Sequence, residues 1–217
     1  KRGAYLEFSH SPSSSCCLRS WKRGVQPLSS VCLSKHRAVA TLEGHFGGMT
    51  TLAGCCEKYA AQLEQGKGGG SETQAPQLEL LHEIYQLLKT ASPDEVKAAQ
   101  PGLENSLTTA IVQGPAQPIR RLVSSCFGYL YARGARQTLY TTVGQLLGWL
   151  NNKSSPLKNE LAKLAVCAVL GELSEMHGGA MVSLCHETIN LMVKNLKGDL
   201  SLRAASAAAL TAALGGS

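Results

Sequence analysis

Apolar residues recur at helical spacing along most of the chain from residue 76 onward. The clearest stretch runs from Ile119 to Tyr131, where apolar side chains stand at offsets 0, 3, 4, 7, 8, 11 and 12. These offsets place one apolar stripe on a helix of about 3.6 residues per turn. Residues 139–150 and 181–196 repeat nearly the same offsets. The pattern predicts a series of amphipathic helices, each with one face in a shared core.

Two further helices are predicted nearer the N-terminus. Apolar spacing indicates one within residues 49–65 and another from 76 to 88. Between them, residues 66–75 begin with the run Gly66–Ser71 and read as a flexible linker. This run lacks the G-x-x-x-x-G-K-[ST] order of a phosphate-binding loop, and no strand precedes it.

Ser, Pro and Gly mark the expected helix boundaries. Ser92 can cap a helix that has Pro93 in its first position and Glu95 closing a capping box. Pro101-Gly102 is expected to break that helix in two. Ser155-Pro156 is expected to start the next helix by the same combination of cap and proline.

The last helices differ in how much apolar surface they carry. Residues 161–173 are apolar on nearly every side, which predicts neighbours on both flanks. Gly178-Gly179 is expected to close this helix. Gly198-Asp199 reads as a turn, with Asp199 as N-cap of an Ala-rich helix over 200–214. No segment alternates with period 2, so the ordered part is predicted to be all-α.

Three stretches, Pro118 to Leu130, Pro156 to Leu173 and Leu202 to Gly215, read as one repeated unit. Each is an apolar helix expected to end near a glycine, and Gly128, Gly171 and Gly215 are 43 and 44 residues apart. This spacing lies within the roughly 40–47-residue period of HEAT and armadillo helix pairs. We therefore predict an α-solenoid over residues 76–217. The apolar third copy lacks the polar outer face of a terminal repeat, so the array is expected to be incomplete.

Composition agrees with helices packed on helices. Apolar residues make up 44% of the chain, charged residues 17% and aromatic residues only 5%. The net charge of +6 arises in residues 1–46, which hold seven Lys or Arg against Glu7 and Glu43. A nucleic-acid-binding solenoid needs a basic stripe on its folded face, and none is visible, so no nucleic-acid partner is expected.

Residues 1–48 form a basic, Ser-rich segment without sustained periodicity. We predict a largely disordered or atypical N-terminal region. An organelle transit peptide shares this bias and remains the alternative. The chain begins at Lys1, which either a processed product or a fragment would explain. No apolar run approaches the roughly 20 residues of a membrane span.

Eight cysteines show no C-x-x-C spacing of a zinc or redox site. Three of them, Cys126, Cys167 and Cys185, fall on apolar helical stripes and are predicted to be core thiols. Unpaired thiols indicate a cytosolic compartment. The full set is Cys16, Cys17, Cys32, Cys55, Cys56, Cys126, Cys167 and Cys185.

No catalytic, cofactor-binding or metal-ligating constellation is predicted. His82-Glu83 resembles the start of H-E-x-x-H, but Gln86 stands where the second His is needed. Cys185 and His186 are adjacent, and their side chains on a helix point about 100° apart, so they form no nucleophile–base pair. Further histidines and cysteines in the N-terminal region match no zinc module: His10, Cys16, Cys17, Cys32, His36 and His45.

Four arginines are the densest basic group in the predicted helical part. Arg120 and Arg121 begin one helix, while Arg133 and Arg136 surround Gly134. The two pairs need not share a face, so solvated charges at helix ends are the favoured interpretation. Binding of phosphate or of an acidic partner is the alternative.

Residues 76–217 resemble the HEAT repeat-containing protein 5 family of large trafficking scaffolds, near the N-terminal end of that family's chain. The resemblance follows ordered packing motifs. These are the Leu78–Leu88 helix, Pro115-x-x-Pro118-x-Arg120 leading to Leu130-Tyr131, Leu161–Cys167, Glu187–Leu191 and the closing Leu214-Gly215-Gly216.

The resemblance implies a non-enzymatic cytosolic protein, peripheral at the trans-Golgi network and endosomal vesicles. Its partners would be the clathrin adaptor complex or accessory proteins, in sorting, endocytosis and retrograde transport. No catalytic residue, cofactor or small-molecule substrate is carried over from the family. The rivals are another HEAT or armadillo scaffold, such as a nuclear transport receptor or phosphatase scaffold, and a regulatory arm of an enzyme whose catalytic part lies elsewhere.

Overall fold

The computed structural model describes residues 51–65, 74–152 and 155–215, all within one compact unit, Thr50–Ser217. This part of the chain is all-helical and contains no strand. The predicted N-terminal region of residues 1–48 and most of the predicted linker lie outside it. The helices are α1 (Leu52–Gln65), α2 (Gln74–Thr90), α3 (Pro93–Gln113), α4 (Gln117–Arg133), α5 (Gln137–Asn151), α6 (Glu160–His177), the 3-10 helix η3 (Gly178–Ala180), α7 (Val182–Asn195) and α8 (Leu200–Gly215).

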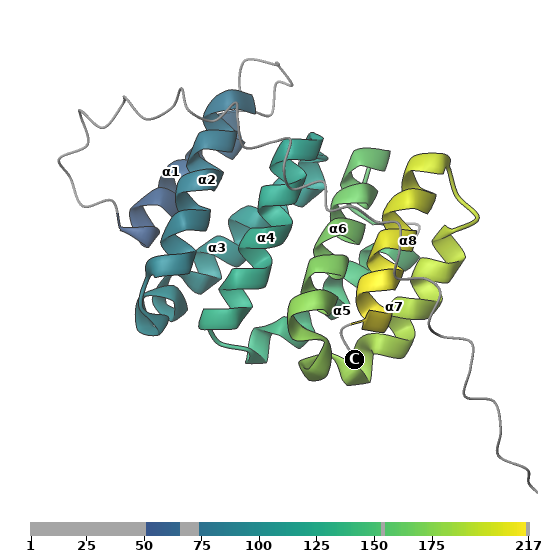
Figure 1. Ribbon diagram of the computed structural model, residues 1–217. Helices are drawn as coiled ribbons and strands as arrows, with labels where there is room; N and C mark the ends of the chain where they lie inside the picture. Colours follow the sequence, from purple (N-terminus) through teal and green to yellow (C-terminus); the bar gives the residue numbers. More distant parts are fainter. Residues whose placement is uncertain (1–50, 66–73, 153–154, 216–217) are drawn as a thin grey trace, which may run out of the picture. The chain divides into compact units, whose positions relative to one another are not determined.

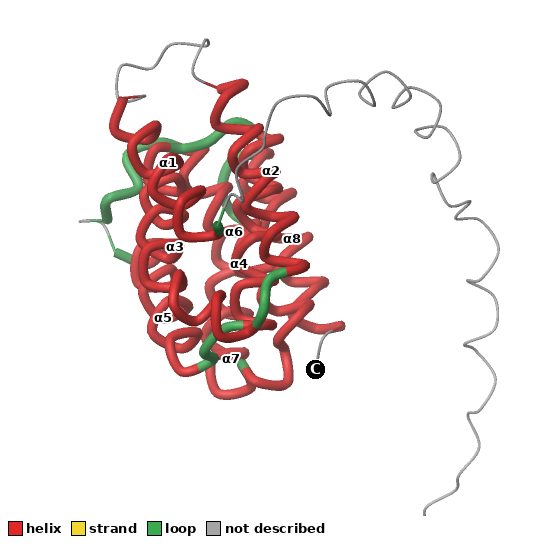
Figure 2. The backbone as a smooth tube through the Cα atoms, turned by 90° about the vertical axis from the view of Figure 1, so that its left-hand side faces the viewer, coloured by secondary structure: helices red, strands yellow, loops and turns green. Residues whose placement is uncertain are grey.

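The helices form two layers. Helices α2, α4, α6 and α8 follow one another in one layer, and each contacts the next (Figure 1). Helices α1, α3, α5 and α7 lie behind them, and Figure 2 shows α1, α3 and α5 on one side of the molecule and α2, α4 and α8 on the other. Each of these back-layer helices packs on the front-layer helix that follows it in the sequence. The described part of the chain is therefore built of four consecutive helix pairs.

The core follows the apolar stripes that the sequence predicts. In α4, the side chains of Phe127, Leu130 and Tyr131 are fully buried. Burial of a side chain of this size contributes about 1.5–3 kcal/mol to folding. Helix α6 lies between α4 and α8, which confirms the two flanking neighbours predicted for it.

Two of the three repeated glycines lie where neighbouring helices of the front layer meet. Gly128 and Gly171 stand inside α4 and α6, so the prediction that these two helices end near their glycines is wrong, whereas α8 ends at Gly215 as predicted. A Cβ at Gly128 would overlap the Met176 side chain of α6, and one at Gly171 would lie 3.2 Å from the Cα of Ala209 in α8. At Gly171 the missing side chain lets α6 and α8 approach closely, whereas at Gly128 it leaves room for the Met176 side chain.

The predicted break at Pro101-Gly102 is also wrong, because α3 is continuous with Pro101 inside it. Proline removes one helical hydrogen bond, at a cost of about 3 kcal/mol or more. Both residues are exposed, whereas Val96 and Leu103 on either side of them are fully buried. A Cβ at Gly102 would lie 3.3 Å from the Cys56 sulfur of α1. Packing of α3 on α1 therefore holds the helix together through its weakest point.

The predicted N-cap and first residue of α3 are confirmed, but the predicted capping box is not, because Glu95 takes part through its amide and not through its carboxylate. Ser92 is the N-cap, its hydroxyl accepts a hydrogen bond from the Glu95 amide at 3.3 Å, and Pro93 opens the helix. The predicted linker, in contrast, extends two residues too far, because α2 already begins at Gln74.

Helix α6 begins later than Ser155-Pro156, so that predicted start is wrong. Asn159 is the N-cap, and its Oδ1 accepts a hydrogen bond from the Ala162 amide at 2.7 Å. Ser155 instead makes a local turn, in which its hydroxyl accepts from the Leu157 amide at 3.1 Å. Leu157 is buried and ties this segment to the core before the helix starts.

The same Asn159 side chain meets the end of α3. Gly114, the C-cap of α3, has a φ of 74°, in the left-handed region that glycine adopts without strain. A Cβ at Gly114 would overlap the carboxamide of Asn159. The Nδ2 of Asn159 also donates to the Gln113 carbonyl at 3.5 Å. One side chain thus contacts the end of α3 and caps the start of α6.

Helix α7 buries a different set of residues from the predicted stripe. Thr188 and Met192 are buried as expected, and so is Leu191, which the stripe did not include. Val193, a member of the predicted stripe, has 47% of its surface exposed. Asp199 directly precedes α8, and its carbonyl accepts the first helical bond, from the Arg203 amide at 2.8 Å.

Leucine at position 171 should destabilise the protein, because the added side chain meets the backbone of α8. We expect Gly171→Leu to lower the free energy of unfolding by about 1–3 kcal/mol. Gly144 in α5 has open space around its Cα, so the matched Gly144→Leu should raise that free energy by about 0.5–1 kcal/mol. Urea unfolding followed by circular dichroism measures both, and equal effects would contradict the close contact at Gly171.

The helix start at Asn159 can be tested separately. Asn159→Ala removes the capping oxygen and should cost about 1 kcal/mol of stability. Ser155→Ala, at the position first expected to cap this helix, should change stability by less than about 0.5 kcal/mol. If the serine variant proves the more destabilised in urea unfolding, α6 begins at the earlier position.

Candidate functional site

An aromatic–lysine cluster lies on the seam between α2 and α4. The Tyr85 and Tyr129 rings pack edge to face, with centroids 5.4 Å apart. The Lys89 ammonium lies 4.9 Å from the Tyr85 centroid and 5.5 Å from that of Tyr129, within the range of cation–π attraction. The exposed His82 lies next to Tyr85, with ring centroids 6.5 Å apart. We call His82, Tyr85, Lys89 and Tyr129 the aromatic–lysine cluster.

Two contacts, one on each side of this cluster along the helices, set the register of α2 against α4. The Cys126 thiol donates to the Leu81 carbonyl at 3.9 Å, and the Arg133 guanidinium donates to the Ala91 carbonyl at 2.9 Å. Both pairs join residues about one repeat apart. The two helices therefore run in the same direction, which brings equivalent positions, including the two tyrosines, to the same height.

The next two seams of the front layer carry acidic side chains of α6. Burial raises the pKa of the Glu172 carboxyl, and the neighbouring Glu175 adds to this, while a hydrogen bond with Ser125 opposes it. Between α6 and α8 lies a hollow of about 380 Å³, lined by Glu175, Ala208 and Thr211 among others. The exposed surface of α2, α4, α6 and α8, which we call the front-layer face, thus has a basic aromatic part and an acidic part.

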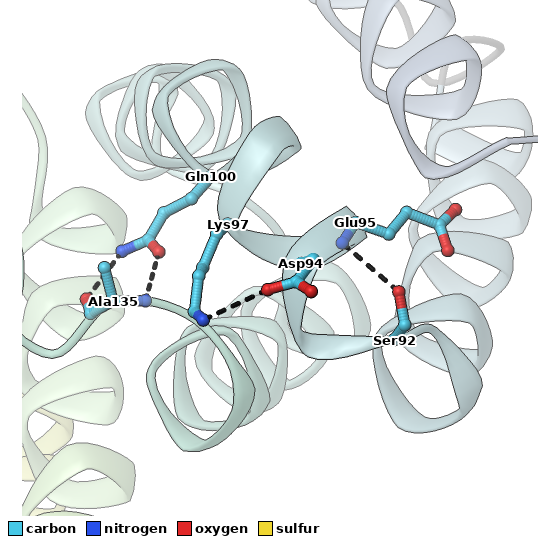
Figure 3. A network of polar contacts seen from close by, with 6 residues as sticks. All are labelled: Ser92, Asp94, Glu95, Lys97, Gln100 and Ala135. Carbon is cyan, nitrogen blue, oxygen red and sulfur yellow. Dashed lines mark hydrogen bonds and ion pairs between the residues drawn. The ribbon is translucent and has the colours of Figure 1, made fainter.

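A buried polar link joins α3 to the loop between α4 and α5. The Gln100 side chain, 3% exposed, pairs with both backbone groups of Ala135 (Figure 3). Its Nε2 donates to the Ala135 carbonyl at 2.9 Å, and its Oε1 accepts from the Ala135 amide at 2.7 Å. Nε2 is also 2.7 Å from both Glu104 Oε1 and Thr138 Oγ1. This link fixes the position of α5 relative to the α3–α4 pair.

The four arginines do not form one patch. Arg120 and Arg121 lie in the first turn of α4 and Arg133 lies in its last turn, roughly 20 Å away along the helix. Arg133 is engaged with the Ala91 carbonyl, and Arg136 is the N-cap residue of α5. Partial burial, with Arg121 alongside, lowers the pKa of Arg120. The structure therefore keeps Arg120 and Arg121 apart from Arg133 and Arg136, as the sequence indicated.

The residues of the incomplete H-E-x-x-H motif share one helix. His82 Nε2 lies 3.4 Å from the Gln86 side-chain nitrogen, which occupies the position of the missing second histidine. Cys185 is half-buried and His186 is exposed on α7. Within the described ranges, no group of three or more His, Cys, Asp or Glu side chains could hold a metal ion.

The described cysteines are mostly core thiols. Cys126 and Cys167 are fully buried, as predicted, and burial raises the pKa of both, that of Cys167 to about 11. Cys55 and Cys56 are buried in α1, and desolvation raises the pKa of each. Cys185 is only half-buried, so its placement in the core is wrong. The cysteines and histidines at positions 10–45 lie outside the described residues.

The aromatic–lysine cluster and the Gln100 link were not predicted as sites. A signal for the cluster does exist in the sequence, because Tyr85 and Tyr129 are 44 residues apart, the same spacing as the repeated glycines. For the Gln100 link no comparable signal exists. Its partners are the backbone groups of a loop residue, and any residue type could supply them.

Comparison with known proteins finds no protein family whose model matches this chain. No solved structure matches it either. Among the helices that the structure describes, none is both long enough and apolar enough to cross a membrane.

Removal of the Gln100 amide should destabilise the junction between the helix pairs. Gln100→Ala leaves the half-buried amide and carbonyl of Ala135 without these partners, at an expected cost of about 1–3 kcal/mol. Gln86→Ala, which removes an exposed amide from α2, should change stability by less than about 0.5 kcal/mol. Urea unfolding compares them, and a small effect of Gln100→Ala would show that water replaces the lost bonds.

Proposed function

We propose that the protein is a non-enzymatic scaffold whose helix pairs stack as a HEAT-type α-solenoid. The observation that carries this proposal is the repeated close contact in the front layer. Gly128 meets α6 and Gly171 meets α8 at equivalent places one repeat apart. Repeats of this kind bury their apolar faces on neighbours and offer extended surfaces to partners.

The process we propose is vesicle-mediated transport. The support is the resemblance of residues 76–217 to the HEAT repeat-containing protein 5 family, carried by the ordered motifs of the sequence. On this proposal the protein works in the cytosol, peripheral at the trans-Golgi network and endosomes. It assists the clathrin adaptor complex in sorting, endocytosis and endosome-to-Golgi retrograde traffic, and it localises proteins rather than transforming a substrate.

The front-layer face is the surface that we propose for partner binding. Tyrosine is enriched where binding energy concentrates in protein interfaces. In the aromatic–lysine cluster, Tyr85 and Tyr129 are half-buried, so their contact area is already partly ordered before a partner arrives. Lys89, held over both rings, adds a positive charge suited to an acidic or carboxylate-bearing segment of the partner.

An affinity pulldown from cell extract, with the chain as bait, tests this function. We expect clathrin adaptor subunits to be recovered. Lys89→Glu reverses the charge of the cluster and should lower their recovery about tenfold, which corresponds to about 1.4 kcal/mol of binding free energy. Lys58→Glu makes the same change on the exposed surface of α1, in the back layer, and should leave recovery unchanged.

Other recovered proteins would contradict the proposal. Importin cargo or phosphatase subunits in place of adaptor subunits would assign the scaffold to nuclear transport or to phosphatase assembly. Equal loss of adaptor subunits with both lysine variants would show that the aromatic–lysine cluster is not the contact surface.

A further inference from the structure

The methionines of the helix layers differ sharply in their exposure to solvent. Met176, in the last turn of α6, is 39% exposed. Met181 is 2% exposed and Met192 is fully buried. Peroxides oxidise the methionine sulfur where they can reach it. Among the methionines that the structure describes, Met176 is therefore the one that an oxidant reaches first.

Most of the described thiols compete poorly for the same oxidant. A cysteine reacts with peroxide as its thiolate, so a buried thiol with a raised pKa is inert. Burial raises the pKa of Cys126 and Cys167, and desolvation does the same for Cys55 and Cys56. Cys185 is only half-buried and lies on α7. A thioether carries no proton, so its reaction with peroxide does not depend on such a pKa.

The Met176 side chain fills a notch that Gly128 leaves in the neighbouring helix α4 (Figure 1). A Cβ at Gly128 would overlap the Met176 sulfur, so the sulfur occupies the place of the missing side chain. Two more residues of α6 meet the same glycine. The Cγ of Glu172 would lie 3.2 Å from that Cβ, and the Nε2 of His177 is 2.9 Å from the Gly128 carbonyl oxygen. The end of α6 is thus docked on one residue of α4, and the thioether supplies an apolar part of this contact.

A sulfoxide at position 176 suits this notch poorly. Oxidation converts the apolar thioether into a polar group whose oxygen accepts hydrogen bonds but donates none. The ionised carboxylate of Glu172, beside the notch, is also an acceptor only. The ring nitrogen of His177 is already engaged with the Gly128 carbonyl. The oxidised side chain is therefore expected to leave the notch for solvent, so that α4 and α6 lose their contact at this place.

We propose that Met176 is a reversible oxidation site that loosens the α4–α6 seam, with hydrogen peroxide as the oxidant. A lone pair of the sulfur attacks one peroxide oxygen, so that a sulfur–oxygen bond forms while the oxygen–oxygen bond breaks. The hydroxide that leaves takes the remaining proton from the sulfur-bound oxygen and becomes water. The sulfur loses the two electrons that the peroxide gains. Methionine sulfoxide reductases reverse the oxidation, which lets the side chain return to its notch.

This site does not depend on the identity of any partner, because the notch belongs to the packing of the helices. It does lie next to the surface proposed for partner binding. Tyr129 of the aromatic–lysine cluster directly follows Gly128 in α4. Loosening of the α4–α6 seam therefore acts on the helix that carries one of the two tyrosines.

Limited oxidation of the whole chain by hydrogen peroxide, followed by tandem mass spectrometry of its peptides, tests the position. We expect one oxygen atom to be added at Met176 roughly tenfold faster than at Met181 or Met192, because the sulfur atoms of those two are buried. Equal rates at the three methionines would overturn the proposal. This measurement needs no variant, so it does not depend on the folding of one.

Thermal unfolding followed by circular dichroism tests the effect on the seam. After the peroxide step, a thiol reductant restores reversibly oxidised cysteines and leaves the sulfoxide in place. The unfolding midpoint of the wild type should still be lower by roughly 3–8 °C. Met176→Leu fills the notch with a side chain of similar volume that peroxide does not oxidise, so its midpoint should stay constant. An unchanged wild-type midpoint, or an equal drop in both chains, would contradict the proposal.

Two further samples test the location and the reversal. Leu200→Met, made in the Met176→Leu chain, places an oxidisable side chain at a position of α8 that is 76% exposed. Peroxide should oxidise this side chain without lowering the midpoint, because it lies mostly in solvent. Treatment of the oxidised wild type with methionine sulfoxide reductases A and B should restore its midpoint. A drop in the Leu200→Met control, or a reduced wild type that does not recover, overturns the assignment to Met176.

Discussion

The close approach of neighbouring helices in the front layer is the constraint on which the rest of the structure depends. At the α6–α8 seam the backbones meet at Gly171 opposite Ala209, and at the α4–α6 seam Gly128 leaves room for the Met176 side chain. A larger residue at position 171 would push α6 and α8 apart, and the apolar contacts on both sides would be lost with them. Because the helices run in the same direction, each seam also brings together side chains that are one repeat apart in the sequence.

The surface chemistry follows from this packing. Tyr85 and Tyr129 meet only because α2 and α4 are parallel and in register, and Lys89 is held between two rings for the same reason. Within the back layer, the junction between α3 and α5 is different. Between α3 and α5 the closest links are polar, from Gln100 to Ala135 and Thr138, and α3 makes its apolar contacts with α1 and α4 instead. The two layers thus combine apolar seams in front with a hydrogen-bonded junction behind.

The sequence predicted best what local periodicity decides. The extent of α4 and the buried residues of α4 and α5 agree with the apolar stripes, since an amphipathic stripe already specifies which side faces the core. The errors fall where tertiary contacts overrule a local signal. Pro101 suggested a break, but burial of Val96 and Leu103 keeps α3 continuous. Ser155-Pro156 suggested a helix start, but burial of Leu157 delays it to Asn159.

The contact between Asn159 and Gly114 couples two helix ends that are far apart in the sequence. The side chain that caps α6 also rests against the turn that ends α3, and that turn depends on a glycine in the left-handed region. A larger residue at position 114 would therefore meet the side chain that caps α6 as well as strain the end of α3. One change in sequence at this place would be felt in two consecutive helix pairs.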